Sequence, residues 1–209
     1  MKVAIVSDVH CNIEGLRHAL ELMSPFDELI CAGDSIFQFR WSNEVVGLLR
    51  ERGARVILGN HEETVFGREG ERVRSSPKVR EDLLQWLGER PYRIEAEVGG
   101  KRLLVIHSSP WEPYRDYHYP HEMVWSRAAE LECDTLIVGH THFQMAQRYG
   151  STLVINPGSA GDPRDHRNGF RLSCATWETT TGEVTFYDYD DPTRNFAARS
   201  GELHPSQGR

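Results

Sequence analysis

Side chains that bind metal ions follow the apolar runs of this 209-residue sequence at regular positions. Seven of them occur in five groups along the chain: Asp8 and His10, Asp34, Asn60, His107, and His140 and His142. In an open α/β sheet, side chains that follow the carboxyl ends of the strands converge on one crevice. Two residues spaced by two point to the same side of an extended backbone. We therefore expect the five groups to meet in a single site.

Each group by itself also has an ordinary structural explanation. Asp8 before a helix is typical of an N-cap, Gly59-Asn60 is typical of a type I′ turn, and a single histidine such as His107 is often just a hydrogen-bonded polar residue. The repetition of these residue types after five successive strands is not expected from independent caps. Glycines precede three of the groups and allow tight turns and close approach of the backbone: Gly33, Gly59 and Gly139.

The donor set indicates two metal ions and chemistry at phosphorus. One carboxylate can bridge two cations, so the seven side chains can supply four contacts to each of two metals. A mixed Asp, Asn and His set suits manganese, iron or zinc, whereas calcium prefers nearly all-oxygen ligands. Two divalent transition-metal ions about 3.5–4 Å apart clamp a phosphoryl group for in-line attack and acidify a shared water. His61, next to Asn60, is positioned to donate a proton or a hydrogen bond to the phosphate or the leaving oxygen.

The elements that must position these residues alternate in the first half of the chain and form hairpins in the second. Apolar runs predict strands at these positions: 2–7, 28–32, 55–58, 92–98, 101–106, 135–138 and 152–155. Helical spacing predicts helices after the first two strands, after Ser76-Pro77 and over 121–132, and a last hairpin turns at 179–182. The pattern predicts one α/β domain over residues 1–190, with partly parallel and partly antiparallel sheets, followed by a polar tail over 191–209.

Composition and charge exclude several classes of protein. Hydrophobic residues make up 39% and charged residues 26%, which is typical of a globular protein and not of a disordered or membrane-bound one. The 24 Lys and Arg against 31 Asp and Glu give a net charge of −7, so we do not expect stable binding to duplex nucleic acid. The four cysteines lie far apart and the N-terminus shows no signal-peptide pattern, so we expect reduced thiols and a cytoplasmic protein.

Five sequence blocks resemble the signature of the calcineurin-like metallophosphoesterase superfamily. They are Asp8-x-His10, Gly33-Asp34, Gly59-Asn60-His61-Glu62, His107 and Gly139-His140-Thr141-His142. Their order and spacing, together with Asn156-Pro157-Gly158-Ser159 and Pro163-Arg164-Asp165, resemble the small prokaryotic phosphodiesterase-type branch most. This resemblance implies a four-layer αββα sandwich, in which two mixed β-sheets are flanked by helices.

The same resemblance implies a role for each residue of the predicted site. The first metal would be held by Asp8, His10, Asp34 and His142, and the second by Asp34, Asn60, His107 and His140. Asp34 would then bridge the two ions. A hydroxide bridging the metals would attack phosphorus, and His61 would stabilise the phosphate or protonate the leaving group.

The sequence departs from the superfamily pattern in the region that binds phosphate. Glu62 stands where many small phosphodiesterases have Asp. The protein phosphatases follow Gly-Asp with Asp-Arg-Gly, whereas residues 35–40 here read Ser-Ile-Phe-Gln-Phe-Arg. The phosphate-binding arginine of the phosphatases is therefore missing from that position. Arg40 or Arg115 is a candidate replacement, and Arg164 either reaches the mouth of the site or belongs to an Arg–Asp surface pair.

The segment directly after His107, residues 108–120, is rich in aromatic side chains: Trp111, Tyr114, Tyr117, His118 and Tyr119. The segment either packs on the domain as a loop or forms a wall over the metals. In the second case its rings, including Tyr117, would stack on a base or an aryl group of the substrate.

These observations predict an enzyme that hydrolyses phosphodiester or nucleotide-type phosphoester bonds, with a small phosphoester or nucleotide as substrate. The alternatives are a phosphomonoesterase, including a protein phosphatase, and a non-catalytic interaction scaffold of the same fold. The missing Asp-Arg-Gly argues against the phosphatase, and the complete set of ligands argues against the scaffold. The sequence makes no prediction of the oligomeric state or of the native metal pair.

Overall fold

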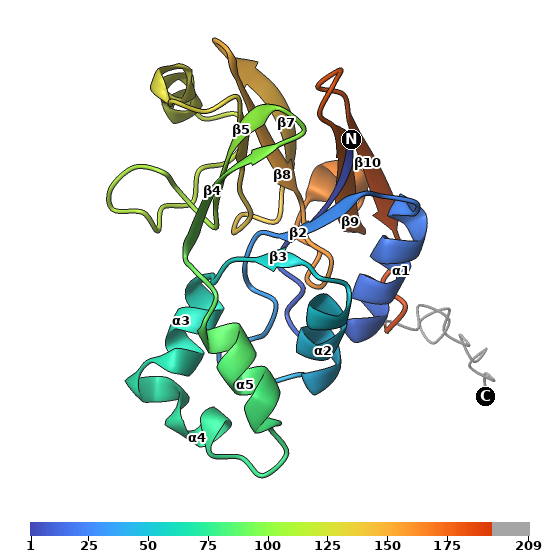
Figure 1. Ribbon diagram of the computed structural model, residues 1–209, viewed down its shortest axis with the longest axis vertical. Coiled ribbons are helices and arrows are strands. Elements are labelled where there is room, and N and C mark those ends of the chain that lie inside the picture. Colours follow the sequence, from blue (N-terminus) through green and yellow to red (C-terminus); the bar gives the residue numbers. More distant parts are fainter. Residues whose placement is uncertain (194–209) are drawn as a thin grey trace, which may run out of the picture.

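Two five-stranded β-sheets stacked face to face form the centre of the computed structural model, which describes residues 1–193 (Figure 1). In spatial order the first sheet consists of β10 (Val184–Tyr189), β9 (Leu172–Glu178), β1 (Lys2–Val6), β2 (Glu28–Cys31) and β3 (Arg55–Val56). The second consists of β4 (Arg93–Val98), β5 (Lys101–Ile106), β6 (Thr135–Ile137), β8 (Thr152–Pro157) and β7 (Gln144–Tyr149). Most of the predicted tail over 191–209 lies outside the described residues.

Parallel strands make up the part of each sheet that leads into the predicted site. β1, β2 and β3 run parallel, with Ala4 opposite Leu29. β5, β6 and β8 also run parallel, with Leu104 opposite Leu136. The remaining strands, β9, β10, β4 and β7, pair antiparallel. This arrangement places the loops after the parallel strands of the two sheets next to one another.

An apolar layer fills the space between the sheets. Its buried residues include Ile5 and Ile30 from the first sheet and Val105, Ile137 and Ile155 from the second. The residues that alternate with them along the strands face outward and form two further buried clusters with the helices. Three apolar layers therefore separate four structural layers, which confirms the predicted αββα sandwich.

The helices on the first sheet share one buried cluster with it: α1 (Ile13–Met23), α2 (Asn43–Glu51), α3 (Asn60–Phe66) and α5 (Glu81–Gly88). Between α3 and α5 lie the short elements η1 (Arg68–Gly70) and α4 (Glu71–Arg74), and η3 (His166–Asn168) precedes β9. Figure 1 shows α3, α4 and α5 grouped together at the lower end of the molecule. The outer face of the second sheet is covered by a 3-10 helix, η2 (Met123–Glu130).

Several elements differ from the sequence prediction. The pattern misses β7, because Met145 is the one buried residue of this strand. It also misses α3, a seven-residue helix that begins at the predicted ligand Asn60. The helix expected at Ser76-Pro77 begins only at Glu81, after a turn, and the helix expected over 121–132 is the shorter 3-10 helix η2.

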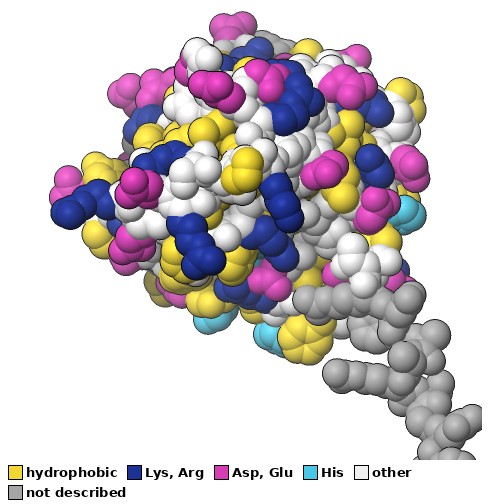
Figure 2. Space-filling model, turned by 90° about the horizontal axis from the view of Figure 1, so that it is seen from below, with side chains coloured by type: hydrophobic (Ala, Val, Ile, Leu, Met, Phe, Trp, Pro, Cys, Tyr) yellow, Lys and Arg dark blue, Asp and Glu magenta, His cyan; other side chains and the backbone are white. Residues whose placement is uncertain are grey.

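The distribution of charges, helices and cysteines can be compared with the expectations from composition. On the face shown in Figure 2, Lys and Arg side chains lie among Asp and Glu side chains and apolar groups. None of the helices within residues 1–193 combines the length and the hydrophobicity needed to cross a bilayer. All four cysteines lie in the described part of the chain and none forms a disulfide, as their spacing predicts.

The helix on the second sheet supplies a test of the packing. Trp125 is 1% exposed, and its indole N–H donates to the carbonyl of Tyr119 at 3.1 Å. We expect Trp125→Ala to lower the free energy of unfolding by about 3–5 kcal/mol, because lost burial and a cavity add. Met123→Ala, on the same 3-10 helix but 85% exposed, should change it by less than about 0.5 kcal/mol. Urea denaturation measures both, and equal effects of the two substitutions would contradict the packing.

Candidate metal centre

The loops after β1, β2, β5 and β6 and the first turn of α3 bring all seven predicted metal-binding side chains together. Five of the seven have positive φ angles between 47° and 67°: Asp8, His10, Asp34, His140 and His142. Residues other than glycine rarely adopt this left-handed region, and such strain persists where the surroundings fix it, often at functional sites. The N–H groups of Asp8 and His10 donate to the carbonyls of Gly33 and Asp34, at 3.1 and 3.0 Å, which joins the first two loops.

The first group of donors surrounds Asp8. Its Oδ1 atom lies 3.2 Å from Nε2 of His142 and 3.9 Å from Nε2 of both His10 and His107. Nε2 of His10 and Nε2 of His142 are themselves only 3.2 Å apart. The other oxygen, Oδ2, accepts a hydrogen bond from the backbone N–H of His140 at 3.0 Å. Asp8 therefore connects the loop after β1 with the loop after β6.

The second group of donors surrounds Asp34. Its Oδ2 atom lies 3.1 Å from Nε2 of His107, and Oδ1 of Asn60 lies at the same distance from that nitrogen. One donor atom each of Asp34, His107 and His140 falls within 4.8 Å of the other two. Asp34 also has a donor atom within 4.8 Å of one on His10, a member of the first group. The carboxylate of Asp34 thus lies between the two groups.

Hydrogen bonds outside the centre fix the orientation of two of the histidines. Nδ1 of His107 lies 2.7 Å from the carbonyl oxygen of Ala32, and Nδ1 of His142 lies 2.6 Å from that of Asp162. Because a carbonyl only accepts, both Nδ1 atoms carry a proton. In the neutral rings the Nε2 lone pairs then point into the centre, as in histidines that bind metals.

Several buried polar atoms of the centre lack a hydrogen-bond partner within residues 1–193. Three buried atoms there have no hydrogen-bond partner among the described residues: Oδ1 of Asp8, Nδ1 of His10 and Nε2 of His140. Buried polar atoms without a partner are costly, and carboxylate, amide and imidazole atoms that face one another are stabilised by a cation. The residues present therefore fit divalent transition-metal ions.

The pKa values of these groups follow from burial and from their mutual charge. Burial lowers the pKa of His10 and of His140 to about 4, so both rings are neutral near pH 7. Burial acts in the same direction on His107, but the Asp34 carboxylate outweighs it and raises the pKa of His107 to about 10. Burial acts to raise the pKa of Asp8, yet three neighbouring histidines hold it well below its usual range.

Glu62 joins the loop after β2 to the start of α3. Its buried carboxylate accepts hydrogen bonds from the N–H groups of Asp34 (3.0 Å), Ile36 (3.1 Å) and Gly59 (2.9 Å) and from the hydroxyl of Ser35 (2.7 Å). Burial and the charge of Asp34 raise the pKa of Glu62 to about 7, against the effect of these bonds. The resemblance identifies Glu62 as part of a motif and not as a support for the two loops, although Gly59-x-x-Glu62 has the spacing of a capping box.

Asn156 and Ser159 support the centre from the other side. The amide of Asn156 donates to the carbonyl of Gly139 at 2.7 Å and to the hydroxyl of Thr141 at 3.1 Å. The hydroxyl of Ser159 donates to the carbonyl of Asp8 at 2.7 Å. The segment that resembles the prokaryotic branch in sequence therefore holds the backbone of two metal-binding loops in place.

His61 presents a donor to the centre. Its Nδ1 accepts a hydrogen bond from the N–H of Gln38 at 2.9 Å, so the proton of the neutral ring is on Nε2. Nε2 lies 3.7 Å from Oδ2 of Asp34, and burial lowers the pKa of His61 below its usual value. The ring packs at centroid distances of 4.7 Å against both Phe37 and His10. A neutral imidazole with its N–H directed inward can donate to a group bound there.

The three candidate arginines each bind another group of the protein. The guanidinium of Arg40 donates to the carbonyl of His10 at 2.7 Å, and Arg115 pairs with Glu63. Arg164 pairs with Asp162 at 2.8 Å. Its neighbour in sequence, Asp165, is paired with Arg167 instead, at 2.6 Å. All three arginines lie near the centre, but each is already in a hydrogen bond or an ion pair.

The aromatic segment after His107 both packs on the domain and faces the centre. Trp111 and His118 pack against the buried Trp125, at centroid distances of 5.7 and 5.9 Å. The ring of Tyr117 instead stacks on that of His140, with centroids 3.9 Å apart and 29° between the planes. The two alternatives posed by the sequence therefore apply to different residues of one segment.

This arrangement has counterparts among known proteins. A family model described as the calcineurin-like phosphoesterase superfamily domain matches residues 1–182. The chain belongs to this superfamily. An uncharacterised protein of Methanocaldococcus jannaschii is 26% identical over 196 residues and covers 79% of each chain. A second protein of that organism, named a phosphodiesterase, is 25% identical over 167 residues, which cover 76% of this chain and 83% of the relative.

A crystal structure of a metallophosphoesterase from Sphaerobacter thermophilus superposes with a TM-score of 0.74 at 25% identity, covering 91% of this chain and 89% of the other. Together these matches confirm the resemblance stated from the sequence. They place the chain among the metal-dependent phosphoric ester hydrolases.

Substitution of Gly59 tests whether the surroundings confine the Asp34 carboxylate. A Cβ atom at this residue would overlap the Asp34 carboxylate, while its φ of −102° suits any residue. We expect Gly59→Ala to weaken binding of Mn²⁺ by roughly tenfold or more, because Asp34 must move. Gly47→Ala in α2, where the nearest atom would be 3.8 Å away, should leave it unchanged. Equilibrium dialysis of the two variants measures the affinities, and equal binding would show that Asp34 is not confined as described.

Proposed function

We propose that the chain is a dinuclear-metal phosphodiesterase acting on small phosphodiesters or nucleotide-type phosphoesters. The position of Asp34 between two groups of potential metal ligands carries this proposal. The first ion would be held by Asp8, His10, Asp34 and His142. The second would be held by Asp34, Asn60, His107 and His140. Asp34 is then the ligand that both ions share.

The donor set suits manganese, iron or zinc more than calcium or magnesium, because four of the seven ligands are histidines. Such ions, when bound, would neutralise charge on the phosphoryl oxygens and lower the pKa of water. The protein would hold the buried carboxylates of Asp8 and Asp34 and the neutral rings of His10 and His140 in fixed positions around the ions. This supports hydrolysis of a phosphoester at the centre.

His61 is the proposed donor to the substrate. Its N–H on Nε2 is directed at the centre, and the bond from Gln38 keeps the ring in that tautomer. A hydrogen bond from this group would stabilise a phosphoryl oxygen or the leaving oxygen as negative charge develops there. His61 lies beside the ligand Asn60 in sequence but would act on the substrate instead of a metal.

Charge favours diesters over monoesters as substrates. A phosphodiester carries one negative charge, whereas a monoester dianion carries two and needs a further cationic group. Arg40, Arg115 and Arg164 are each already bound to a protein acceptor. The relative named a phosphodiesterase supports the same choice.

The unpaired thiols support a cytoplasmic location for the enzyme.

Turnover by metal-stripped protein reloaded with Mn²⁺ tests the proposed activity. We expect kcat/KM to be higher for bis(p-nitrophenyl) phosphate than for p-nitrophenyl phosphate. Asn60→Ala should lower the diester value by about 100-fold, because the second ion loses a ligand. A preference for the monoester would instead indicate a phosphatase, and no turnover of either ester by metal-loaded protein would contradict the proposal.

The role of His61 can be separated from metal binding. We expect His61→Ala to lower kcat for the diester by about 100-fold, the usual scale for loss of a proton donor, with bound manganese unchanged. His18→Ala, a half-exposed histidine on α1, serves as the control and should keep full activity. Loss of manganese from the His61 variant would show that the residue is a metal ligand.

A further inference from the structure

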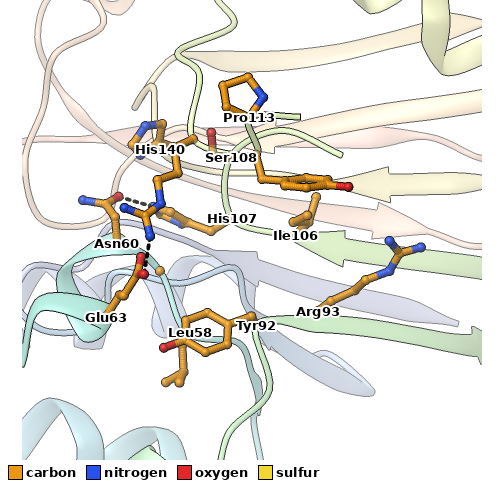
Figure 3. A pocket seen from close by; sticks show the side chains of 13 residues that line it. Leu58, Asn60, Glu63, Tyr92, Arg93, Ile106, His107, Ser108, Pro113 and His140 are labelled. Carbon is orange, nitrogen blue, oxygen red and sulfur yellow. Dashed lines mark hydrogen bonds and ion pairs between the residues drawn. The ribbon is translucent and has the colours of Figure 1, made fainter. Parts of the chain in front are cut away.

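A cavity of about 540 Å³ opens directly beside the second group of donors (Figure 3). Figure 3 shows Asn60, His107 and His140 along one side of this cavity and Arg93 on the opposite side. Leu58, at the end of the first sheet, is part of its apolar lining. A volume between roughly 300 and 1,000 Å³ is usual for sites that bind small molecules. A group attached to a phosphate at the centre could therefore extend into this space.

Two tyrosines line the cavity with much of their surface exposed. Tyr92 is 53% exposed and Tyr114 is 50% exposed, although both are large aromatic residues. Tyr114 has a positive φ of 63°, and its N–H donates to the carbonyl of Trp111 at 2.7 Å. Strain of this kind in a bulky residue is often kept at ligand-binding positions. Both residues therefore present exposed aromatic surface next to the apolar lining.

The charged side chains of the cavity are paired with one another or with their neighbours. Arg115 pairs with Glu63, and Arg93 pairs with Glu95 on β4. The remaining lining is apolar or aromatic, with Ile106 and Pro113 opposite Leu58. Such a surface suits an uncharged ring better than a second phosphate or a charged peptide.

From these observations we propose that the cavity binds a planar aromatic group of the substrate, an aryl ring or a nucleobase, between Tyr92 and Tyr114 while the phosphoryl group occupies the metal centre. The inference rests on the proposed function, since it places phosphorus at the donors Asn60, His107 and His140. It adds the substrate class: aromatic phosphoesters, of which nucleotides are one source. Tyr92 lies directly before β4, at a distance in sequence from the motif residues of the metal centre.

Binding of phosphonates that the enzyme cannot hydrolyse tests the proposal without turnover. In calorimetry on manganese-loaded protein, phenylphosphonate should bind about tenfold more tightly than methylphosphonate, the scale of one stacked ring. Tyr92→Ala combined with Tyr114→Ala should remove this preference and leave methylphosphonate binding unchanged. Tyr92→Phe, which keeps the ring, should retain it. Phe170→Ala, 60% exposed elsewhere on the surface, is the control.

Further measurements distinguish a nucleobase from a simple aryl group as the bound ring. They also separate failure of the ring site from failure of the proposed catalysis. A nucleoside 5′-phosphonate that binds more tightly than phenylphosphonate would identify a nucleobase, and the reverse order would identify a simple aryl group. Equal binding of phenylphosphonate and methylphosphonate, or a preference that survives in the double variant, would overturn the ring site. If the ring preference is present but bis(p-nitrophenyl) phosphate is not hydrolysed, the proposed catalysis fails and the ring site stands.

Discussion

The position of the Asp34 carboxylate is the constraint on which the rest of the centre depends. Its backbone N–H is held by Glu62, its carbonyl accepts from His10, and its Oδ1 accepts from the N–H of His61 at 2.9 Å. Its Oδ2 is thereby directed at His107. A side chain at Gly59 would occupy the space that this carboxylate needs. Three segments of the chain therefore fix one carboxylate at the point where two donor groups meet.

The packing of the two sheets on each other fixes the position of the two halves of the centre relative to one another. Asp8, Asp34 and Asn60 follow strands of the first sheet, whereas His107, His140 and His142 follow strands of the second. The distance between these two sets is set by the buried apolar layer between the sheets, since protein interiors are close-packed. Two buried carboxylates that follow strands of the first sheet then face histidines of the second: Asp34 lies 3.1 Å from His107, and Asp8 lies 3.2 Å from His142.

Much of this could be predicted from the sequence, because the donors come directly after strands and their spacing is distinctive. The strand positions also follow from apolar runs with clear periods, and the layer order follows from the resemblance to the superfamily. The supporting contacts could not be predicted in the same way. Glu62 and Asn156 bind backbone groups of distant loops, so their roles depend on tertiary structure and not on any local period. The edge strand β7 and the cavity beside Tyr92 likewise depend on which segments pack together.

The most direct test of this account is the state of manganese in the loaded protein. We expect elemental analysis to find two ions per chain and electron paramagnetic resonance to show that they are spin-coupled, since they would share the Asp34 carboxylate. Asp34→Asn should lose the coupling, because an amide is a poorer bridge than a carboxylate. One ion per chain, or two ions without coupling in the unaltered protein, would contradict the claim that Asp34 joins two metal sites.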